Sequence, residues 1–418
     1  MISCNIELPG RSRWLTARAN LPDAGRGSKR VYARFSRPLG AWPIEFLRLR
    51  TLLAAPYFGN QFHDAFIRTA VAQGTIPLRV RGRRLNFFVA RMNAGAEPVF
   101  ARIQASARWS SSAGWQQVSF QALGSPCRLQ FLAPGPSLAF GQTILKWVAG
   151  FEARYSRFLP DSLISRINRA AGKEWVAIDP ETDRLFALCH EMHFLTRGVF
   201  DPTALPLIEL WDWKARPPVL PEEATVQAAL RKVGWRKVQR APGKVFLPET
   251  GMTLDLGGVG KEYAVDQVLQ LALELGATSV LVDFGHDVRV HGPAPQNKPA
   301  WHIGLEDPRR PGQCWTGVAI NQRAVATSGD YLRCFVHEGR RYGHILDVRT
   351  GRPVANGCLA VSVVAPSCTL AGMLSTAAFV LGPEEGLRLL ESTYAAAGCI
   401  ITETGRVPSR KFCEYATS

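Results

Sequence analysis

The chain lacks the long apolar run that a membrane-spanning helix needs. Its longest candidate, residues 371–382, is short and interrupted by polar side chains, whereas a helix that crosses a bilayer needs about 20 apolar residues. We therefore expect no transmembrane segment. Paired cysteines are also missing, because the nine cysteines are scattered and form no CxxC motif. This excludes a zinc ribbon and gives no disulfide framework, so we expect reduced, mostly buried thiols.

Acidic residues are scarce in the first quarter of the chain. Residues 1–110 hold 18 Lys and Arg against 5 Asp and Glu, and so carry +13 of the net charge of +16. The remainder is nearly balanced, so the global charge gives no reason to expect nucleic-acid binding by the body. The run VRGRR at 80–84 allows contact with nucleic acid or acidic lipid, although a solvated charge run is the commoner explanation.

Residues 1–115 also lack sustained periodicity, because Arg, Ser, Gly and Pro recur between short apolar groups. We predict a basic extension of poor order. A targeting segment and translation from a misplaced start codon are alternatives. The sequence shows neither an apolar signal core nor a cysteine placed for lipid attachment, so it does not decide the compartment.

A compact body is predicted over residues 116–418, where periodic segments become frequent. The expected helices are 137–158, 180–196, 222–232, 261–275, 368–381 and 383–391. The expected strands are 127–132, two short ones within 244–254, 279–283, 287–290, 301–305, 315–320, 331–337, 358–365 and 396–402. Because strands and helices do not alternate strictly, an α+β fold with mixed, largely antiparallel sheets and packed helices is favoured over a doubly wound sheet.

The stretch LDLGGVGKEYAVD at 254–266 predicts a strand, a glycine turn and a helix. Gly257, Gly258 and Gly260 can adopt backbone angles closed to other residues, and a helix N-terminus offers free N–H groups to an anion. Asp255 and Lys261 add the charges that suit a phosphate together with a metal or a ribose. The spacing is neither GxGxxG nor a P-loop, and alone it is as often a tight turn as a ligand site.

Two polar clusters allow more than one interpretation. Cys189, His190 and His193 suggest a metal site, but HEMH is one residue short of HExxH and core packing is the simpler explanation. Asp201, on a proline-rich turn, either caps the following turn or binds a ligand hydroxyl.

Aromatic and hydroxyl residues give two more alternatives. Trp211 and Trp213 either stack on a planar ligand or pack in the core with an N–H partner. A hairpin between VATSGDY and HILDVRTG would bring Ser328 and His344 to neighbouring loops, where they form a shared site or only ordinary hairpin contacts.

Eight segments in order resemble the FAD:protein FMN transferases, the ApbE-like flavin transferases. They are LGS (123–125), FLPDSLISRIN (158–168), VFDPTALPLIELWDW (199–213), LDLGGVGKEYAVD (254–266), WHIGLEDP (301–308), VATSGDY (325–331), HILDVRTGRPV (344–354) and LSTAAFVLG (374–382). The resemblance covers about 120–405 and none of the first 115 residues. It implies a mixed α+β body that binds FAD in a cleft and uses Mg²⁺ to transfer FMN to a threonine of a flavin-accepting partner protein, with release of AMP.

The resemblance also implies roles for individual residues. It places FAD contacts at Leu123, Phe158, Val199, Phe200, Asp201, Asp255, Lys261 and Ile345. His344 would accept the proton of the incoming threonine, a role suited to its near-neutral pKa. The magnesium ligands that carry over are the carbonyl of Gly258 and the hydroxyl of Thr376.

The chain departs from the family pattern at the metal. Gly372 stands where the family has its metal-binding aspartate, and Glu262 stands where it has a glycine; Phe158 replaces a tyrosine. Because Mg²⁺ usually keeps one or two protein carboxylates, losing the aspartate should weaken its binding. Asp347, Glu262 and Asp255 are candidates to replace it, and the sequence does not choose among them.

Two further departures are His286, in place of the second glycine of a pair, and Val348, in place of a proline. These changes leave a second function open, an FAD-binding protein that carries the flavin without transfer. A third hypothesis makes the basic first quarter a nucleic-acid module, although no nucleic acid is expected as a partner of the body.

Overall fold

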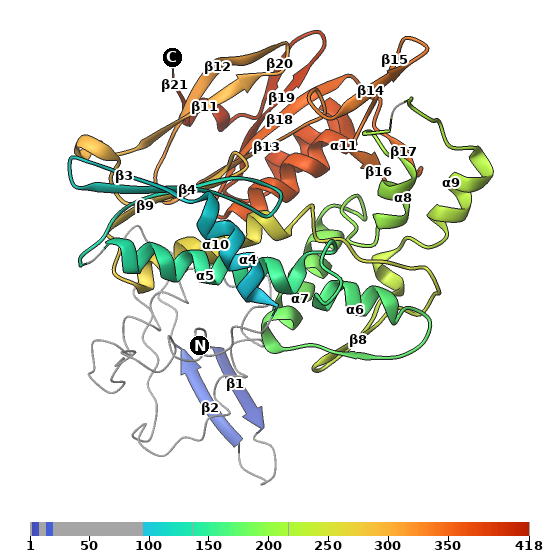
Figure 1. Ribbon diagram of the computed structural model, residues 1–418, viewed down its shortest axis with the longest axis horizontal. Coiled ribbons are helices and arrows are strands. Elements are labelled where there is room, and N and C mark those ends of the chain that lie inside the picture. The colour runs from blue at the N-terminus through green and yellow to red at the C-terminus, as the bar shows by residue number, and fades with distance from the viewer. Residues whose placement is uncertain (1, 8–13, 20–94, 136, 216, 418) are drawn as a thin grey trace. The chain divides into compact units, whose positions relative to one another are not determined.

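A computed structural model describes residues 2–7, 14–19, 95–135, 137–215 and 217–417 (Figure 1). The chain divides into two units, 1–84 and 85–418. In the first unit, β1 (Ile2–Glu7) and β2 (Trp14–Ala19) form an antiparallel pair. The run VRGRR and most of the predicted extension lie outside the described residues.

The second unit is built on a nine-stranded sheet in which all neighbouring strands are antiparallel. The strand order is β20 (Arg406–Pro408), β19 (Ala397–Thr402), β18 (Cys358–Ala365), β13 (Ala324–Gly329), β10 (Asp287–His291), β9 (Ser279–Phe284), β5 (Ser125–Leu132), β4 (Trp115–Ala122) and β3 (Arg108–Ser112). This confirms the predicted α+β class with largely antiparallel sheets.

Both faces of the large sheet are covered. The helices α4 (Ala96–Ser106), α5 (Ser137–Tyr155), α10 (Gly260–Glu274) and α11 (Cys368–Ser392) share the main core with one face. The other face packs on a three-stranded sheet of β11 (Trp301–Asp307), β12 (Arg310–Ile320) and β21 (Ala416–Thr417). In Figure 1, α4, α5 and α10 lie below β3, β4 and β9, and β11 and β12 lie above them.

Coverage on both faces explains the apolar central strands. Successive side chains of a strand point to opposite faces. In β9, Val280 and Val282 accordingly enter the helix-side core, while Leu281 between them enters the core under the small sheet. A strand buried on both sides therefore reads as a continuous apolar run instead of an alternating one.

Shorter elements surround this framework. The helices are α6 (Leu163–Arg169), α7 (Pro180–Leu195), α8 (Leu205–Leu210) and α9 (Glu223–Leu230), with 3-10 turns η3 (Trp235–Lys237), η4 (Pro295–Asn297) and η5 (Phe412–Glu414). The strands are β6 (Val176–Ala177), β7 (Gln239–Ala241), β8 (Lys244–Phe246), β14 (Cys334–His337), β15 (Arg340–Gly343), β16 (Leu346–Asp347) and β17 (Arg352–Pro353).

Several predicted boundaries change. Helix α4 and strand β3 precede residue 116, yet Val99 and Ile103 of α4 lie in the main core, so the packed body begins before the predicted start. Only one strand, β8, forms within 244–254. The break between the last two predicted helices is confirmed, because Gly382 leaves the helical conformation at φ 85° and Pro383 follows it. Proline cannot donate the hydrogen bond that a continuous helix needs.

The described residues also bear on the expectations about membrane-spanning helices and free thiols. Among the described residues, no helix combines the length and apolar character needed to cross a membrane. The eight cysteines whose side chains are described are all free, and five of them are buried. This confirms the prediction of unpaired, mostly buried thiols for that part of the chain.

Candidate functional site

The glycine turn differs from its prediction. Residues before Gly257 form no strand, and the turn at 257–259 leads directly into α10 at Gly260. The turn does not use the backbone angles that glycine alone can adopt, because none of the three glycines has a positive φ. A side chain at Gly257 would instead meet the Asp255 carboxylate at 3.3 Å, which accepts the Gly257 N–H at 2.9 Å. A side chain at 257 would therefore crowd the Asp255 carboxylate.

The hydrogen bonds that close this turn leave two of its carbonyl groups available. The N–H groups of Val259 and Gly260 donate to Leu256, and that of Tyr263 donates to Val259. Within the part of the chain that the structure describes, no bond of the turn ends on the carbonyls of Gly257 and Gly258. A backbone carbonyl oxygen without a donor can serve as a ligand of a hard cation.

Charged groups gather beside the turn. Lys261 forms an ion pair with Asp287 at the start of β10, and its Nζ lies 3.4 Å from Oε1 of Glu262. The side chain of Lys261 is 22% exposed, so the ammonium group lies at the surface of the site. Its Cδ would approach a side chain at Gly285, which ties the β9–β10 turn to α10.

Glu262 also contacts Gly372 of α11. A Cβ atom added at Gly372 would lie 2.6 Å from Cγ and 3.3 Å from Oε1 of Glu262. Glu262 is only 8% exposed, and among the described residues its Oε2 atom is buried without a hydrogen-bond partner. Two of the positions at which the chain departs from the family pattern are therefore in direct contact.

Thr376 lies one helical turn beyond Gly372, in a chain of hydroxyl groups. Ser375 donates its proton to the carbonyl of Gly372 at 2.9 Å. Ser375 must therefore accept from the hydroxyl of Ser328, at 2.8 Å. Ser328 in turn accepts from the hydroxyl of Thr376, also at 2.8 Å. Thr376 consequently keeps oxygen lone pairs available to a cation.

Asp266 joins the two helices that carry these groups. Its carboxylate, on α10, accepts hydrogen bonds from the N–H groups of Cys368 and Thr369 and from the Thr369 hydroxyl, all at the start of α11. Arg289 donates to the same carboxylate at 2.7 Å. An acidic group at a helix N-terminus satisfies free N–H donors and the helix dipole together, so the relative position of α10 and α11 is fixed.

Asp255 and Phe158 meet through Arg157. The Nε atom of Arg157 lies 3.2 Å from Oδ2 of Asp255, and its guanidinium carbon lies 4.1 Å from the centroid of the Phe158 ring. The Phe158 side chain is 77% exposed. An exposed aromatic ring beside an arginine is free to stack on a flat ligand. Sequence reasoning missed Arg157.

The Leu123 turn and the start of the 199–213 segment flank the same region. Leu123 has a positive φ of 53°, and its N–H donates to Glu152 at 2.9 Å. Gly285 N–H donates to the carbonyl of Pro126, so this turn lies beside the β9–β10 turn. A Cβ atom at Gly258 would lie 3.8 Å from the ring of Phe200. The 199–203 loop therefore lies against the glycine turn at 257–259, which with the start of α10 is called the cradle below.

The carboxylate of Asp201 is used within the protein. It accepts the N–H and hydroxyl of Thr203 and the N–H of Trp235 at 2.5–2.8 Å, and its side chain is 4% exposed. Of the two alternatives for Asp201, the structure therefore favours the capping role. Val199 and Phe200 are buried as well, so their side chains offer little surface to a ligand.

His344 follows β15 at the end of the hairpin. Burial, with the Arg333 guanidinium nearby, lowers the pKa of the imidazole to about 4, so the near-neutral pKa expected from the sequence is not found. The backbone N–H of His344 donates to the carbonyl of Arg333 at 2.9 Å. In the described structure, the ring atom Nδ1 of His344 is buried without a partner. Its ring lies 6.5 Å from that of Trp213, and Trp211 donates its indole N–H to the carbonyl of Gly351 at 2.7 Å. Trp211 is thus a core residue with an N–H partner.

The 199–213 segment therefore links the cradle to the His344 loop. Its first residues contact the glycine turn, and its two tryptophans contact residues 344–351. Ile345 enters the main core and bonds through its carbonyl to Val354. Ser328 pairs with the hydroxyls of α11; the structure records no contact between Ser328 and His344 among the described residues.

The other predicted clusters serve the core. Burial raises the pKa of Cys189 to about 12, and Nδ1 of His193 lies 2.8 Å from the carbonyl of Phe200. Within the described ranges, no three His, Cys, Asp or Glu side chains gather as a metal cluster.

Gly258, Glu262 and Thr376 instead offer a carbonyl, a carboxylate and a hydroxyl, the hard oxygen donors that Mg²⁺ prefers, so the residues present fit that ion.

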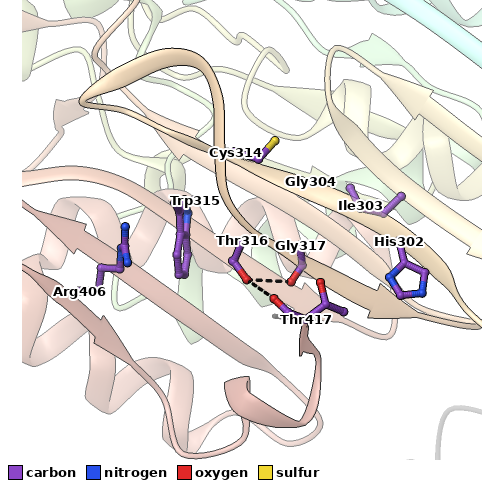
Figure 2. A pocket seen from close by; sticks show the side chains of 9 residues that line it. All are labelled: His302, Ile303, Gly304, Cys314, Trp315, Thr316, Gly317, Arg406 and Thr417. Carbon is purple, nitrogen blue, oxygen red and sulfur yellow. Dashed lines mark hydrogen bonds between the residues drawn. The ribbon is translucent and has the colours of Figure 1, made fainter.

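A surface hollow of about 600 Å³ lies elsewhere, on β11, β12 and β21 (Figure 2). Trp315 forms part of its wall, between the Arg406 guanidinium and the stacked ring of Phe412. The hydroxyl of Thr316 donates to the carbonyl of Thr417 at 2.8 Å. The hollow contains none of the predicted site residues. The candidate site is therefore taken to be the region around the glycine turn at 257–259 and the start of α10.

Comparisons with known proteins concern the same residues. The family model described as the ApbE family matches residues 123–401. An FAD:protein FMN transferase of Vibrio cholerae is 30% identical over 279 residues, which cover 63% of this chain and 78% of that protein. One of Treponema pallidum is 30% identical over 289 residues, covering 64% and 79%.

Solved structures agree with these matches. The ApbE protein of Thermotoga maritima superposes with a TM-score of 0.67 at 31% identity and covers 74% of this chain and all of that one. The flavin transferase ApbE of Vibrio cholerae gives a TM-score of 0.65 at 26% identity over 74% of this chain and 99% of that one. With a family model that spans most of the packed body, and with structures of the same fold, the chain belongs to the ApbE family of flavin transferases.

Proposed function

We propose that this protein transfers FMN from FAD to a threonine of a partner protein and releases AMP, with Mg²⁺ as cofactor. The observation that carries the proposal is the continuous family match over 123–401, whose relatives in Vibrio cholerae and Treponema pallidum are named FAD:protein FMN transferases. That match spans the glycine cradle, the 199–213 segment and His344.

The reaction replaces the phosphoanhydride bond of FAD with a phosphoester bond to the acceptor protein. The threonine oxygen of the acceptor forms a bond to the FMN phosphorus, the bond from that phosphorus to the bridging oxygen breaks, and AMP leaves with the bridging oxygen. The threonine proton must go to a base. The N-terminus of α10 and Lys261 lie where the phosphate charge of FAD would be held.

His344 is the proposed proton acceptor. Its lowered pKa keeps the ring neutral at physiological pH, and only the neutral ring can accept a proton. A base with a pKa near 4 is weak, but nearby negative charge raises the pKa of a histidine. The phosphates of bound FAD would therefore make His344 a stronger base when the substrate is in place.

Other residues position the flavin. Phe158 offers an exposed ring for stacking, and the Leu123 turn and the 199–201 loop form the walls of the proposed cleft. Gly258 and Thr376 would hold Mg²⁺ through a carbonyl and a hydroxyl oxygen. When bound, Mg²⁺ supplies positive charge that neutralises the pyrophosphate.

The test is to incubate the full-length protein with FAD, Mg²⁺ and a flavin-accepting domain, and then measure covalent flavin on the acceptor and AMP in solution. Transfer predicts both products in equal amounts, dependence on the acceptor threonine, and a large loss of rate in H344N with FAD binding retained. FAD binding without AMP at any Mg²⁺ concentration would refute transfer and support the flavin-carrier function.

A further inference from the structure

We propose that Glu262 supplies the carboxylate ligand of the magnesium site, from α10, in place of a side chain at position 372 of α11. This inference rests on the proposed function, because that function requires Mg²⁺. It assigns a metal-binding role to a residue that the family pattern does not predict, and it makes Gly372 a condition for that role.

The first argument is the space that Gly372 leaves. The Glu262 side chain packs where a residue at 372 would place its Cβ atom, which would lie only 2.6 Å from Cγ. Contacts this short do not occur between real side chains, so Glu262 in this position requires glycine at 372. The carboxylate of Glu262 is thereby directed into the volume beside α11.

The second argument is the unpaired oxygen. Lys261 reaches only Oε1 of Glu262, at 3.4 Å, and also pairs with Asp287. Oε2 is buried and has no partner among the described residues, a costly arrangement for a carboxylate unless a cation or donor completes it. Mg²⁺ would supply that missing partner.

The third argument is the register of α10 against α11, which contact each other. Asp266 bonds to Cys368 and Thr369, and one turn earlier on α10, Glu262 meets Gly372, one turn later on α11. The helices therefore run antiparallel. Continued by one turn, past the start of α10 at Gly260, the same register would bring Gly258 toward Thr376, and we infer that the carbonyl, carboxylate and hydroxyl oxygens face a common volume.

The other carboxylates considered as replacements already have partners. Both oxygens of Asp347 pair with the Arg349 guanidinium, at 2.8–2.9 Å. The carboxylate of Asp255 accepts the Gly257 N–H and pairs with Arg157. Of these three candidates, only Glu262 keeps a buried oxygen free for a metal.

The experiment titrates Mn²⁺, as a paramagnetic probe for an oxygen-ligand Mg²⁺ site, into the full-length protein mixed with FAD. Free Mn²⁺ is measured by electron paramagnetic resonance, and flavin fluorescence reports FAD binding in parallel. We expect wild type to bind one Mn²⁺ that Mg²⁺ displaces. E262Q preserves the shape of the side chain and should weaken Mn²⁺ binding about tenfold or more, with FAD still bound.

An exchange of the two positions gives the sharpest test. E262G removes the carboxylate, and G372D alone forces two side chains into one space, so both single variants should bind Mn²⁺ poorly. The double variant E262G/G372D should recover tight binding, because the carboxylate now comes from α11. E274Q, the same chemical change at the exposed end of α10, is the control and should match wild type.

Two results would overturn the inference: Mn²⁺ binding by E262Q equal to wild type, or a double variant that binds no better than E262G. The proposed function is judged separately by AMP release. If AMP forms with the same Mg²⁺ dependence in E262Q and wild type, transfer stands and the ligand assignment fails. If Mn²⁺ binding depends on Glu262 but no AMP forms, the assignment stands and transfer fails.

Discussion

Substitution of Asp266 tests whether one carboxylate holds α10 and α11 together. Its oxygens accept from two backbone N–H groups of α11, from the Thr369 hydroxyl and from Arg289. D266A would leave these donors without an acceptor inside the protein. D266N keeps the size of the side chain but exchanges one acceptor oxygen for a donor.

The magnitudes follow from the partners that are lost. Breaking a largely buried ion pair by removing one side costs about 3–5 kcal/mol, and D266A does this while also uncapping α11, so we expect a loss in that range. In D266N, the Thr369 hydroxyl can rotate to accept a bond, but a backbone N–H cannot. We therefore expect D266N to lose about 2–3 kcal/mol, the range of one or two charge-assisted hydrogen bonds.

Urea unfolding followed by circular dichroism measures both losses, with D161N at an exposed position as the control. Because the Glu262–Gly372 contact lies one helical turn from this carboxylate, D266N should also weaken Mn²⁺ binding while FAD binding is kept. A loss of free energy of unfolding below about 1 kcal/mol in D266A, at an unchanged m value, would refute the reasoning. It would mean that core packing alone aligns the two helices.

Three other predictions use single residues. The pKa of His344 is about 4 in the folded protein against an ordinary 6.5, so folding favours the neutral imidazole. The contribution of His344 to the free energy of unfolding is therefore complete above pH 6.5 and is lost as the pH falls toward 4. Wild type should thus lose up to about 2 kcal/mol more than H344N between pH 7 and pH 5, by urea unfolding at each pH, and equal losses would contradict it. D201A should cost about 2–4 kcal/mol, because it leaves the Trp235 N–H and the Thr203 donors unsatisfied, and should weaken FAD binding measured by fluorescence; a stable variant with normal FAD affinity would show that the loop holds itself. His286 has a φ of 70°, a conformation that costs a non-glycine residue about 1–2 kcal/mol, partly offset by the greater chain entropy of glycine; H286G should raise the thermal midpoint, and a lower midpoint would show that the imidazole makes a compensating contact.

The sequence predicted well what local chemistry determines. The break at Gly382–Pro383, the helix that begins after the glycine turn and the strand at 358–365 all follow from residues near one another in the chain. The predicted strand before Gly257 failed for a tertiary reason. The N–H of Asp255 donates to the carbonyl of Pro202, and that of Leu254 donates to the side chain of Asn168, so this segment is held by loops instead of a neighbouring strand.

The candidate site shows the same limit more sharply. Glu262 and Gly372 look like two unrelated departures from the family pattern, because more than a hundred residues lie between them in the sequence. Their meaning depends on the antiparallel register of α10 and α11, which Asp266 fixes through Cys368 and Thr369. In that register the Glu262 side chain occupies the space that a side chain at 372 would need. The proposed assignment of Glu262 interprets these two departures as one change, in which the metal-binding carboxylate comes from α10 instead of α11.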